Sequence, residues 1–161
     1  MGTITIHICP KCGYGFRRKT GIGMMFPQVY QETVEKAKEG KFGKEIQDFF
    51  RDHPDGAIDA ESVTLCCEAC GCLGTDKDLT MYIPKKRSIL PDIGTKDEGG
   101  SERSYVMRYE LVEFYEKYAD YPHKCGKCGG KMRVIDSEEE LECPVCRVPL
   151  EMDPSGLIMW D

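Results

Sequence analysis

The chain begins with an alternation of apolar and polar residues. Ile4, Ile6 and Ile8 recur with a period of two, which is typical of a strand with one buried face. The sequence therefore predicts a short N-terminal strand that leads directly into a cysteine-containing turn.

Two amphipathic segments that follow this strand indicate helices. The first begins near Pro27, because proline is tolerated in the first turn of a helix, and it ends near Gly40. The second spans Lys44–Asp52 and ends before Pro54. The first segment has the apolar residues Val29, Val34 and Ala37 among charged ones, and Ile46, Phe49 and Phe50 are expected on the inner face of the second.

Short strands are predicted in the rest of the chain. Ser62–Cys66 and Leu79–Ile83 fit this pattern. Near the C-terminus, Pro149–Met152 and Leu157–Trp160 flank Asp153–Gly156. The flanked residues are Asp, Pro, Ser and Gly, which favour turns, so a closing hairpin is predicted.

A tyrosine-rich segment at residues 105–121 fits two periods. Residues 105–111 alternate as in a strand, whereas Leu111, Tyr115 and Tyr118 fit one face of a helix. Both alternatives stay open for this segment.

Residues 85–103 separate two parts of the chain. They combine glycines, a proline and charges of both signs, a composition typical of a linker or mobile loop. A chain of 161 residues is long enough for two small domains. We therefore predict an α+β protein with an N-terminal domain at 1–84, which carries the helices as an insertion, and a C-terminal domain at 104–161.

Ten cysteines add a specific chemistry to this outline. Eight of them form four Cys-x-x-Cys pairs, and this spacing lets two thiolates share one metal ion. A glycine, which admits a left-handed backbone, follows the first three pairs, whereas Arg147 follows the fourth. The pairs, named the first to fourth knuckles in chain order, are Cys9 and Cys12, Cys67 and Cys70, Cys125 and Cys128, and Cys143 and Cys146. We predict that these cysteines bind two Zn²⁺ ions per chain, each through four thiolates.

The third and fourth knuckles are separated by 14 residues, and this Cys-x2-Cys-x14-Cys-x2-Cys arrangement resembles the zinc-ribbon family over about Lys124–Val148. The resemblance implies a β-hairpin, with strands at Lys131–Ile135 and Glu140–Glu142, that brings both knuckles onto one zinc ion. The first and second knuckles, separated by 54 residues, would then share the other ion.

The first knuckle also resembles rubredoxin in the sequence of Cys9–Tyr14, Cys-Pro-Lys-Cys-Gly-Tyr. That resemblance implies an iron centre for electron transfer, although the residues that follow depart from the small rubredoxin fold. The metal of the N-terminal site is therefore open between zinc and iron.

Cys66 and Cys72 flank the second knuckle and are left over from the four pairs. Burial is the favoured interpretation, because free cysteine is among the most buried residue types. A redox role or exchange with a neighbouring ligand is the alternative. No ligand role is assigned to His7, His53 or His123, because four thiolates already complete a tetrahedral shell.

The net charge of the chain bears on whether nucleic acid is a partner. The net charge is -6, and because Zn²⁺ with four thiolates carries -2, two sites bring it to -10. Such a charge disfavours nucleic acid as a partner unless the basic runs at Arg17–Lys19, Lys85–Arg87 and Lys124–Arg133 share one surface.

No apolar run approaches the roughly 18 residues of a membrane span. The N-terminus lacks the features of a secretory signal, so a cytoplasmic protein with reduced thiols is predicted.

The sequence contains no recognised catalytic motif, and four thiolates leave a zinc ion no open position for a substrate. A non-enzymatic role is therefore favoured, with enzyme activity left open. We predict a structural zinc protein that acts as a protein-interaction or scaffolding module for an unknown protein partner. The alternatives are a nucleic-acid-binding zinc ribbon and a thiol-redox or rubredoxin-like electron-transfer protein.

Overall fold

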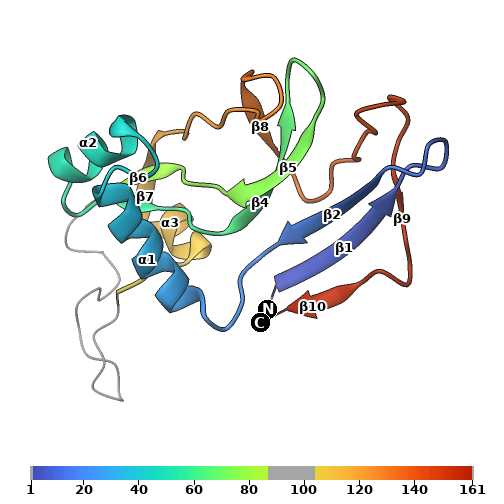
Figure 1. The fold of residues 1–161 in the computed structure, drawn as a ribbon. Coiled ribbons are helices and arrows are strands. Elements are labelled where there is room, and N and C mark those ends of the chain that lie inside the picture. Colours follow the sequence, from blue (N-terminus) through green and yellow to red (C-terminus); the bar gives the residue numbers. More distant parts are fainter. Residues whose placement is uncertain (1, 87–103, 161) are drawn as a thin grey trace. The chain divides into compact units, whose positions relative to one another are not determined.

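The computed structural model describes residues 2–86 and 104–160 (Figure 1). Within these ranges it contains three helices and ten strands, and all strand pairings are antiparallel. This mixture of helices and antiparallel sheets agrees with the α+β prediction. No helix in the described ranges is long and apolar enough to cross a membrane.

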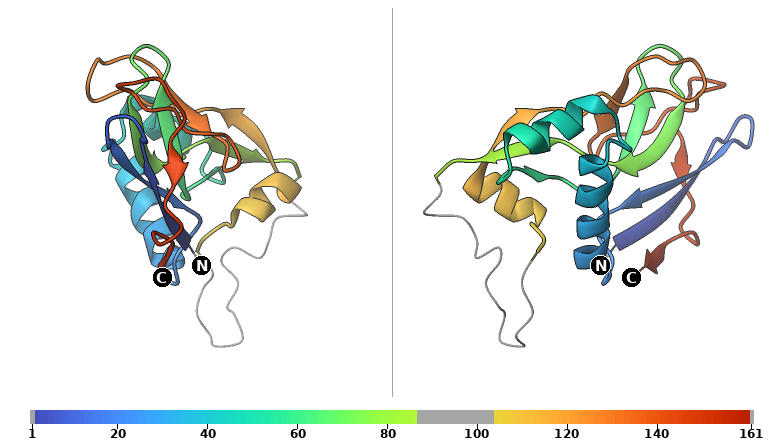
Figure 2. Two further views of the ribbon diagram at one scale, coloured as in Figure 1. Left: turned by 90° about the vertical axis from the view of Figure 1, so that its right-hand side faces the viewer. Right: turned by 60° about the vertical axis from the view of Figure 1, so that its left-hand side comes forward.

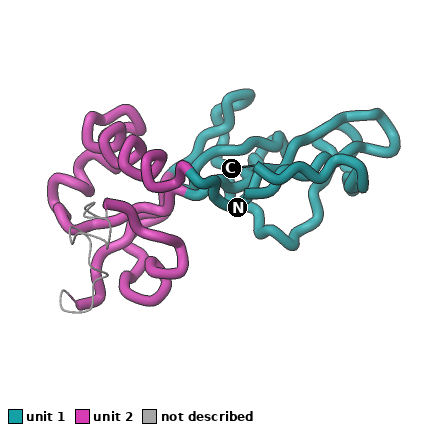
Figure 3. The backbone as a smooth tube through the Cα atoms, turned by 90° about the horizontal axis from the view of Figure 1, so that it is seen from below, with its two compact units in different colours: residues 1–24, 61–78, 122–161 teal, residues 25–60, 79–121 magenta. Residues whose placement is uncertain are grey.

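The chain forms two compact units, each made of segments that are distant in sequence (Figure 3). Unit 1 comprises residues 1–24, 61–78 and 122–161, and unit 2 comprises residues 25–60 and 79–121. This division differs from the predicted domains at 1–84 and 104–161, because the N-terminal strand and the last two knuckles fall in the same unit. Residues 87–103, most of the predicted linker, lie outside the described residues.

The first sheet of unit 1 is built around β1 (Gly2–Ile8), which is the predicted N-terminal strand. β2 (Gly15–Thr20) pairs with one edge of β1. β9 (Glu151–Met152) and β10 (Ile158–Trp160) pair with the other edge. The two ends of the described chain therefore lie side by side (Figure 1).

The predicted closing hairpin between Pro149–Met152 and Leu157–Trp160 is wrong. β9 and β10 pair with β1 and not with each other. The turn between them also lies along β1: the Asp153 N–H donates to the Ile6 carbonyl at 2.9 Å, and a Cβ at Gly156 would come within 2.7 Å of Ile6. Pairing with an existing strand stabilises both short segments more than an isolated two-stranded hairpin would.

The second sheet of unit 1 has the order β5-β4-β8. β4 (Ser62–Cys67) is the central strand, between β5 (Leu73–Lys77) and β8 (Met132–Ile135). This pairing contradicts the predicted hairpin, because β8 pairs with β4, and Glu140–Glu142 forms no strand. The side chain of Ile135, at the end of β8, is buried.

The two sheets of unit 1 share one small core. Its buried members are Cys9, Leu73, Ile135, Leu141, Cys143 and Leu150. Arg18 of β2 adds polar contacts, donating hydrogen bonds to the carbonyls of Asp136 and Glu139, just beyond β8. Two of the six buried members are cysteines. Whether their thiols are protonated or bound to a metal ion therefore affects the stability of this core.

Unit 2 contains the predicted helical region. α1 (Phe26–Lys38) and α2 (Lys44–Asp52) pack against each other (Figure 2). Proline lies in the first turn of α1, as predicted. The buried positions recur at helical spacing and are Phe26, Tyr30, Thr33, Ala37, Ile46, Phe49 and Phe50. Val29 and Val34, two apolar residues that indicate this helix, are not among them.

A three-stranded sheet completes unit 2, in the order β3-β6-β7. Its strands are β3 (Ala57–Ile58), β6 (Met81–Pro84) and β7 (Tyr115–Ala119). The ambiguous segment 105–121 contains a helix and a strand, but in the reverse of the order that its periods suggest. Residues 108–111, which alternate as in a strand, belong to α3 (Arg108–Phe114). Tyr115 and Tyr118, which fit a helical face, belong to β7. The Lys85 ammonium caps the end of α3, donating to the carbonyls of Val112 at 3.0 Å and Glu113 at 3.2 Å.

Candidate metal centres

The four knuckles share one backbone conformation. In each, the N–H of the first cysteine donates to the carbonyl two residues beyond the second cysteine. The residue directly after the second cysteine donates back to the carbonyl of the first. That residue has a positive φ of 74°, 71°, 72° and 59° at Gly13, Gly71, Gly129 and Arg147. Three knuckles thus use glycine where the left-handed backbone favours it, and the fourth uses arginine.

The structure brings all eight knuckle cysteines into two groups of four. Cluster A contains Cys9, Cys12, Cys143 and Cys146, and cluster B contains Cys67, Cys70, Cys125 and Cys128. Within each cluster the four Sγ atoms lie within 4.8 Å of one another. In every knuckle the first cysteine is buried and the second is half-buried or exposed. Each cluster could hold one metal ion, and both belong to unit 1.

The predicted pairing of the knuckles is wrong. The sequence predicts that the first knuckle joins the second and the third joins the fourth, whereas the structure joins the first with the fourth and the second with the third. The 14-residue spacing of the last two knuckles suits a local hairpin. However, the entropic cost of closing a loop grows only slowly with its length, so proximity in sequence does not decide the pairing.

The nested pairing follows from two sub-structures with the same strand register. In the first and second knuckles, the residue before the first cysteine is Ile8 and Cys66, respectively. In the strand pairing, each of these residues lies opposite the residue three positions after the second cysteine of its own knuckle. On the other edge of the strand, Ile8 and Cys66 each lie opposite the residue five positions after the second cysteine of the knuckle that shares their cluster. We call these sub-structures module A, residues 2–20 and 142–160, and module B, residues 62–77 and 124–135. Module B is thus inserted in the sequence between the two halves of module A.

The sulfur positions suit a tetrahedral metal ion. With a metal–sulfur distance of about 2.3 Å, the sulfurs of a regular tetrahedron lie about 3.8 Å apart. Three Sγ pairs lie 3.6, 3.4 and 3.7 Å apart, namely Cys12 with Cys143, Cys67 with Cys128, and Cys70 with Cys125. A disulfide would need about 2.0 Å. Four soft thiolates at this spacing fit Zn²⁺ and also iron.

The thiols of one cluster differ in how readily they ionise. Burial would raise the pKa of Cys9, but backbone N–H groups of its own knuckle outweigh burial and lower that pKa to about 7. Similar N–H groups lower the pKa of Cys125 to about 6. A backbone N–H also lowers the pKa of Cys128, but the thiols of Cys67 and Cys70 outweigh it and raise that pKa to about 12. A metal ion must therefore displace protons from the cluster, so its binding weakens as the pH falls.

Cys66 and Cys72 belong to neither cluster. Cys66 occupies the position that Ile8 has in module A, and it packs against the core of unit 1. Burial raises the pKa of both thiols, which is the direction opposite to that of a reactive thiolate. No histidine is a member of either cluster in the described ranges; the Nε2 atom of His123 lies 2.8 Å from the Asp78 carbonyl oxygen instead.

Gly130 lacks the space for a side chain beside cluster B. A Cβ there would lie 3.1 Å from the Ala69 Cβ and 3.2 Å from the Sγ atoms of Cys67 and Cys128. We predict that Gly130→Ala displaces these ligands and weakens metal binding by about 1–3 kcal/mol, measured by competition with a chromophoric chelator. Gly126→Ala is the matched control, because a Cβ there meets nothing within 4 Å. Equal losses in the two variants would show that space beside the sulfurs is not the cause.

Comparison of the chain with protein-family models, with curated proteins and with solved structures finds no match.

Proposed function

We propose that the protein is a zinc-binding protein in which two structural ions, each held by four cysteines, stabilise a pair of nested zinc ribbons, modules A and B. We propose further that it acts as a protein-interaction or scaffolding module in a reducing compartment such as the cytoplasm. The observation that carries the proposal is the donor set of each cluster, four thiols at tetrahedral spacing. Four thiolates close the shell of a zinc ion, which leaves no position for a substrate or a reactive water.

Metal content tests the first part of this proposal. Protein purified without added metal should contain about two zinc ions per chain by elemental analysis, because each ion takes four thiolates. One ion per chain would contradict the two-site proposal. Iron as the main metal, with the visible absorption of an iron–thiolate centre, would favour the rubredoxin-like alternative instead.

Exposed apolar side chains of module A support an interaction role. Large apolar groups that are exposed on this module are Ile8, Val145, Met152, Leu157, Ile158 and Met159. Leu157 is 61% exposed, and Val145, in the tip of the fourth knuckle, is 71% exposed. Leu157, Ile158 and Met159 are consecutive in the sequence, and a contiguous exposed apolar patch is typical of sites that bind other proteins.

A comparison of bait proteins tests the interaction role. The double variant Leu157→Lys with Ile158→Lys should lose a protein that the wild type captures by cross-linking in cell extract. Val112→Lys is the matched control, because Val112 on α3 of unit 2 is 70% exposed and lies outside module A. Retention of every captured protein by the double variant would contradict a binding role for this surface.

The nucleic-acid alternative has less support, because several basic side chains of unit 1 have partners within that unit. Arg18 is buried against backbone carbonyls, and the Lys19 ammonium lies 3.5 Å from the centre of the Trp160 ring. Arg133 forms a salt bridge with Glu139. These contacts reduce the positive charge that is available to a phosphate backbone.

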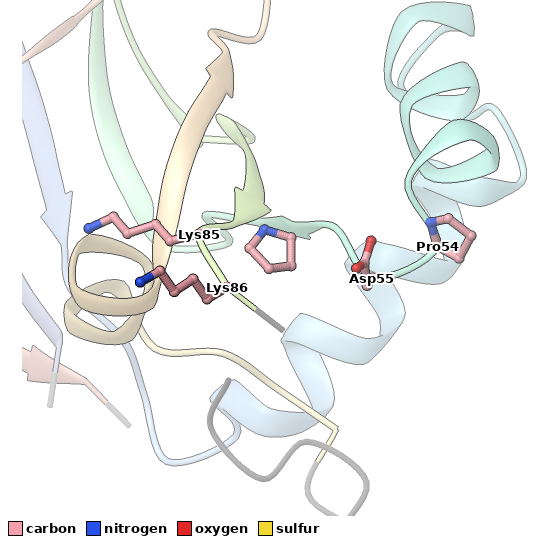
Figure 4. Close-up of a pocket in the computed structure, with 5 residues that line it drawn as sticks. Pro54, Asp55, Lys85 and Lys86 are labelled. Carbon is pink, nitrogen blue, oxygen red and sulfur yellow. The ribbon is translucent and has the colours of Figure 1, made fainter. Parts of the chain in front are cut away.

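The basic run at Lys85–Arg87 follows β6 of unit 2 and is also partly engaged. Lys85 caps α3, and both Lys85 and Lys86 line an open pocket that Asp55 shares (Figure 4). Arg87 lies outside the described residues. We expect weak binding to mixed-sequence DNA and RNA near physiological salt, with a steep loss as salt rises. Submicromolar, salt-resistant binding would favour the nucleic-acid alternative.

A further inference from the structure

Arg147 connects knuckles that belong to different clusters. It directly follows Cys146 of cluster A, and its Nη2 atom donates to the Cys70 carbonyl of cluster B at 3.0 Å. The same guanidinium lies over Gly71, where a Cβ would collide with Nη1. One side chain of the fourth knuckle therefore holds the second knuckle in place, although the two knuckles contribute to different metal sites.

The backbone of Arg147 makes this contact depend on a closed fourth knuckle. Its φ is 59°, and its N–H donates to the Cys143 carbonyl at 2.9 Å. A left-handed backbone is unfavourable for a residue with a Cβ, and the other three knuckles avoid this cost with glycine. We therefore expect Arg147 to adopt this conformation only while the knuckle is closed around its ion, and the guanidinium then reaches Cys70.

We propose that Arg147 couples the two metal centres, so that filling either cluster raises the metal affinity of the other. This inference rests on the proposed function, because it requires both clusters to bind zinc. An ion in cluster A orders the fourth knuckle, and Arg147 then orders the second knuckle before the ion of cluster B arrives. That ion meets a smaller entropic cost, and by thermodynamic linkage the effect is the same in the reverse order.

The charge of Arg147 and the shared core of unit 1 also favour the filling of both clusters. A zinc ion with four thiolates carries -2, so a guanidinium in contact with knuckles of both clusters offsets the repulsion between the two loaded sites. The small core also joins the clusters, since Cys9 and Cys143 pack with Leu73, which follows the second knuckle. Because the core can also couple the clusters, we assign to Arg147 only the part of the coupling that is lost when its side chain is removed.

Native mass spectrometry of the full chain with one equivalent of zinc tests the proposal. For two equal and independent sites about half of the protein would carry one ion, and a coupling on the order of tenfold lowers this to about a quarter. We expect the wild type to show a depleted one-zinc species, and Arg147→Ala to raise it toward the independent value. Arg147→Gly should do the same, although glycine suits the positive φ.

Arg17→Ala is the matched control, because Arg17 is an exposed arginine of the same module, and it should leave the distribution unchanged. A one-zinc fraction in Arg147→Ala and Arg147→Gly equal to that of the wild type would overturn the proposal. Independent loading of the wild type would overturn it as well. Spectra with excess zinc separate this result from the proposed function, because a wild type that never reaches two ions would contradict the two-site proposal itself.

Discussion

Removal of zinc by a chelator is expected to unfold unit 1 while α1 and α2 of unit 2 stay folded. Structural zinc sites in short peptides contribute on the order of 10–16 kcal/mol at neutral pH. The core cluster that the two sheets of unit 1 share is small, with six buried members of which two are candidate ligands. Without the ions we therefore expect the apolar contacts of this core to be too few to maintain both sheets.

Hydrogen exchange with and without the chelator measures this effect. Amides of β1, β2, β4, β5 and β8 should lose their protection, whereas amides of α1 and α2 should keep it, because these helices pack through their own buried face. Zinc should restore the protection of unit 1, and magnesium, which prefers oxygen ligands, should not. Full protection of the strands of unit 1 in metal-free protein would show that the clusters do not stabilise the fold.

Replacement of Cys143 and Cys146 by serine is expected to release β1 and β2, which lie at the opposite end of the sequence. Serine cannot supply an equivalent soft thiolate, so Cys9 and Cys12 lose their partners in cluster A. β9 and β10, which follow the missing knuckle, should also lose protection because they pair with β1. One zinc ion should remain, bound by cluster B.

The matched control replaces Cys66 and Cys72 by serine. It makes the same chemical change at two cysteines outside both clusters, and two zinc ions should remain. Fast exchange confined to residues 124–148 in the first variant, with β1 and β2 still protected, would contradict the structure. That result would instead support the local ribbon implied by the spacing of the third and fourth knuckles.

Features that depend on adjacent residues could be predicted from the sequence. β1 contains the alternating segment Ile4–Ile8 and ends with it, and α2 has the predicted bounds Lys44–Asp52. The knuckles were also recognisable, because two cysteines and a glycine at fixed spacing define that turn. Each of these elements has its signal in a short stretch of adjacent residues.

Features that depend on distant strand pairing could not be predicted from spacing alone. A strand follows the third knuckle as expected, but whether Met132–Ile135 pairs with Glu140–Glu142 or with β4 depends on the edges available in the folded unit. One signal favours the observed pairing. The segments before the first and second knuckles are rich in β-branched residues, Ile4–Ile6 and Ser62–Thr64, which suits central strands with partners on both edges.

Two residues of the candidate site had no recognisable signal of their role. Gly130 lies next to the glycine of the third knuckle, and its close approach to the Cys67 sulfur exists only because the second and third knuckles meet. Arg147 was visible as the departure from glycine in the fourth knuckle, but its acceptor, the Cys70 carbonyl, lies 77 residues away. Both roles follow from the knuckle pairing, so an incorrect pairing conceals them.

Zinc stoichiometry in variants that lack two knuckles tests the central claim, the nested pairing, most directly. With all cysteines of the first and fourth knuckles replaced by serine, the structure predicts one zinc ion per chain, because cluster B stays complete. With the first and second knuckles replaced, it predicts none, because each cluster loses half of its ligands. The opposite result, none in the first variant and one in the second, would contradict the nested pairing and restore the sequential one.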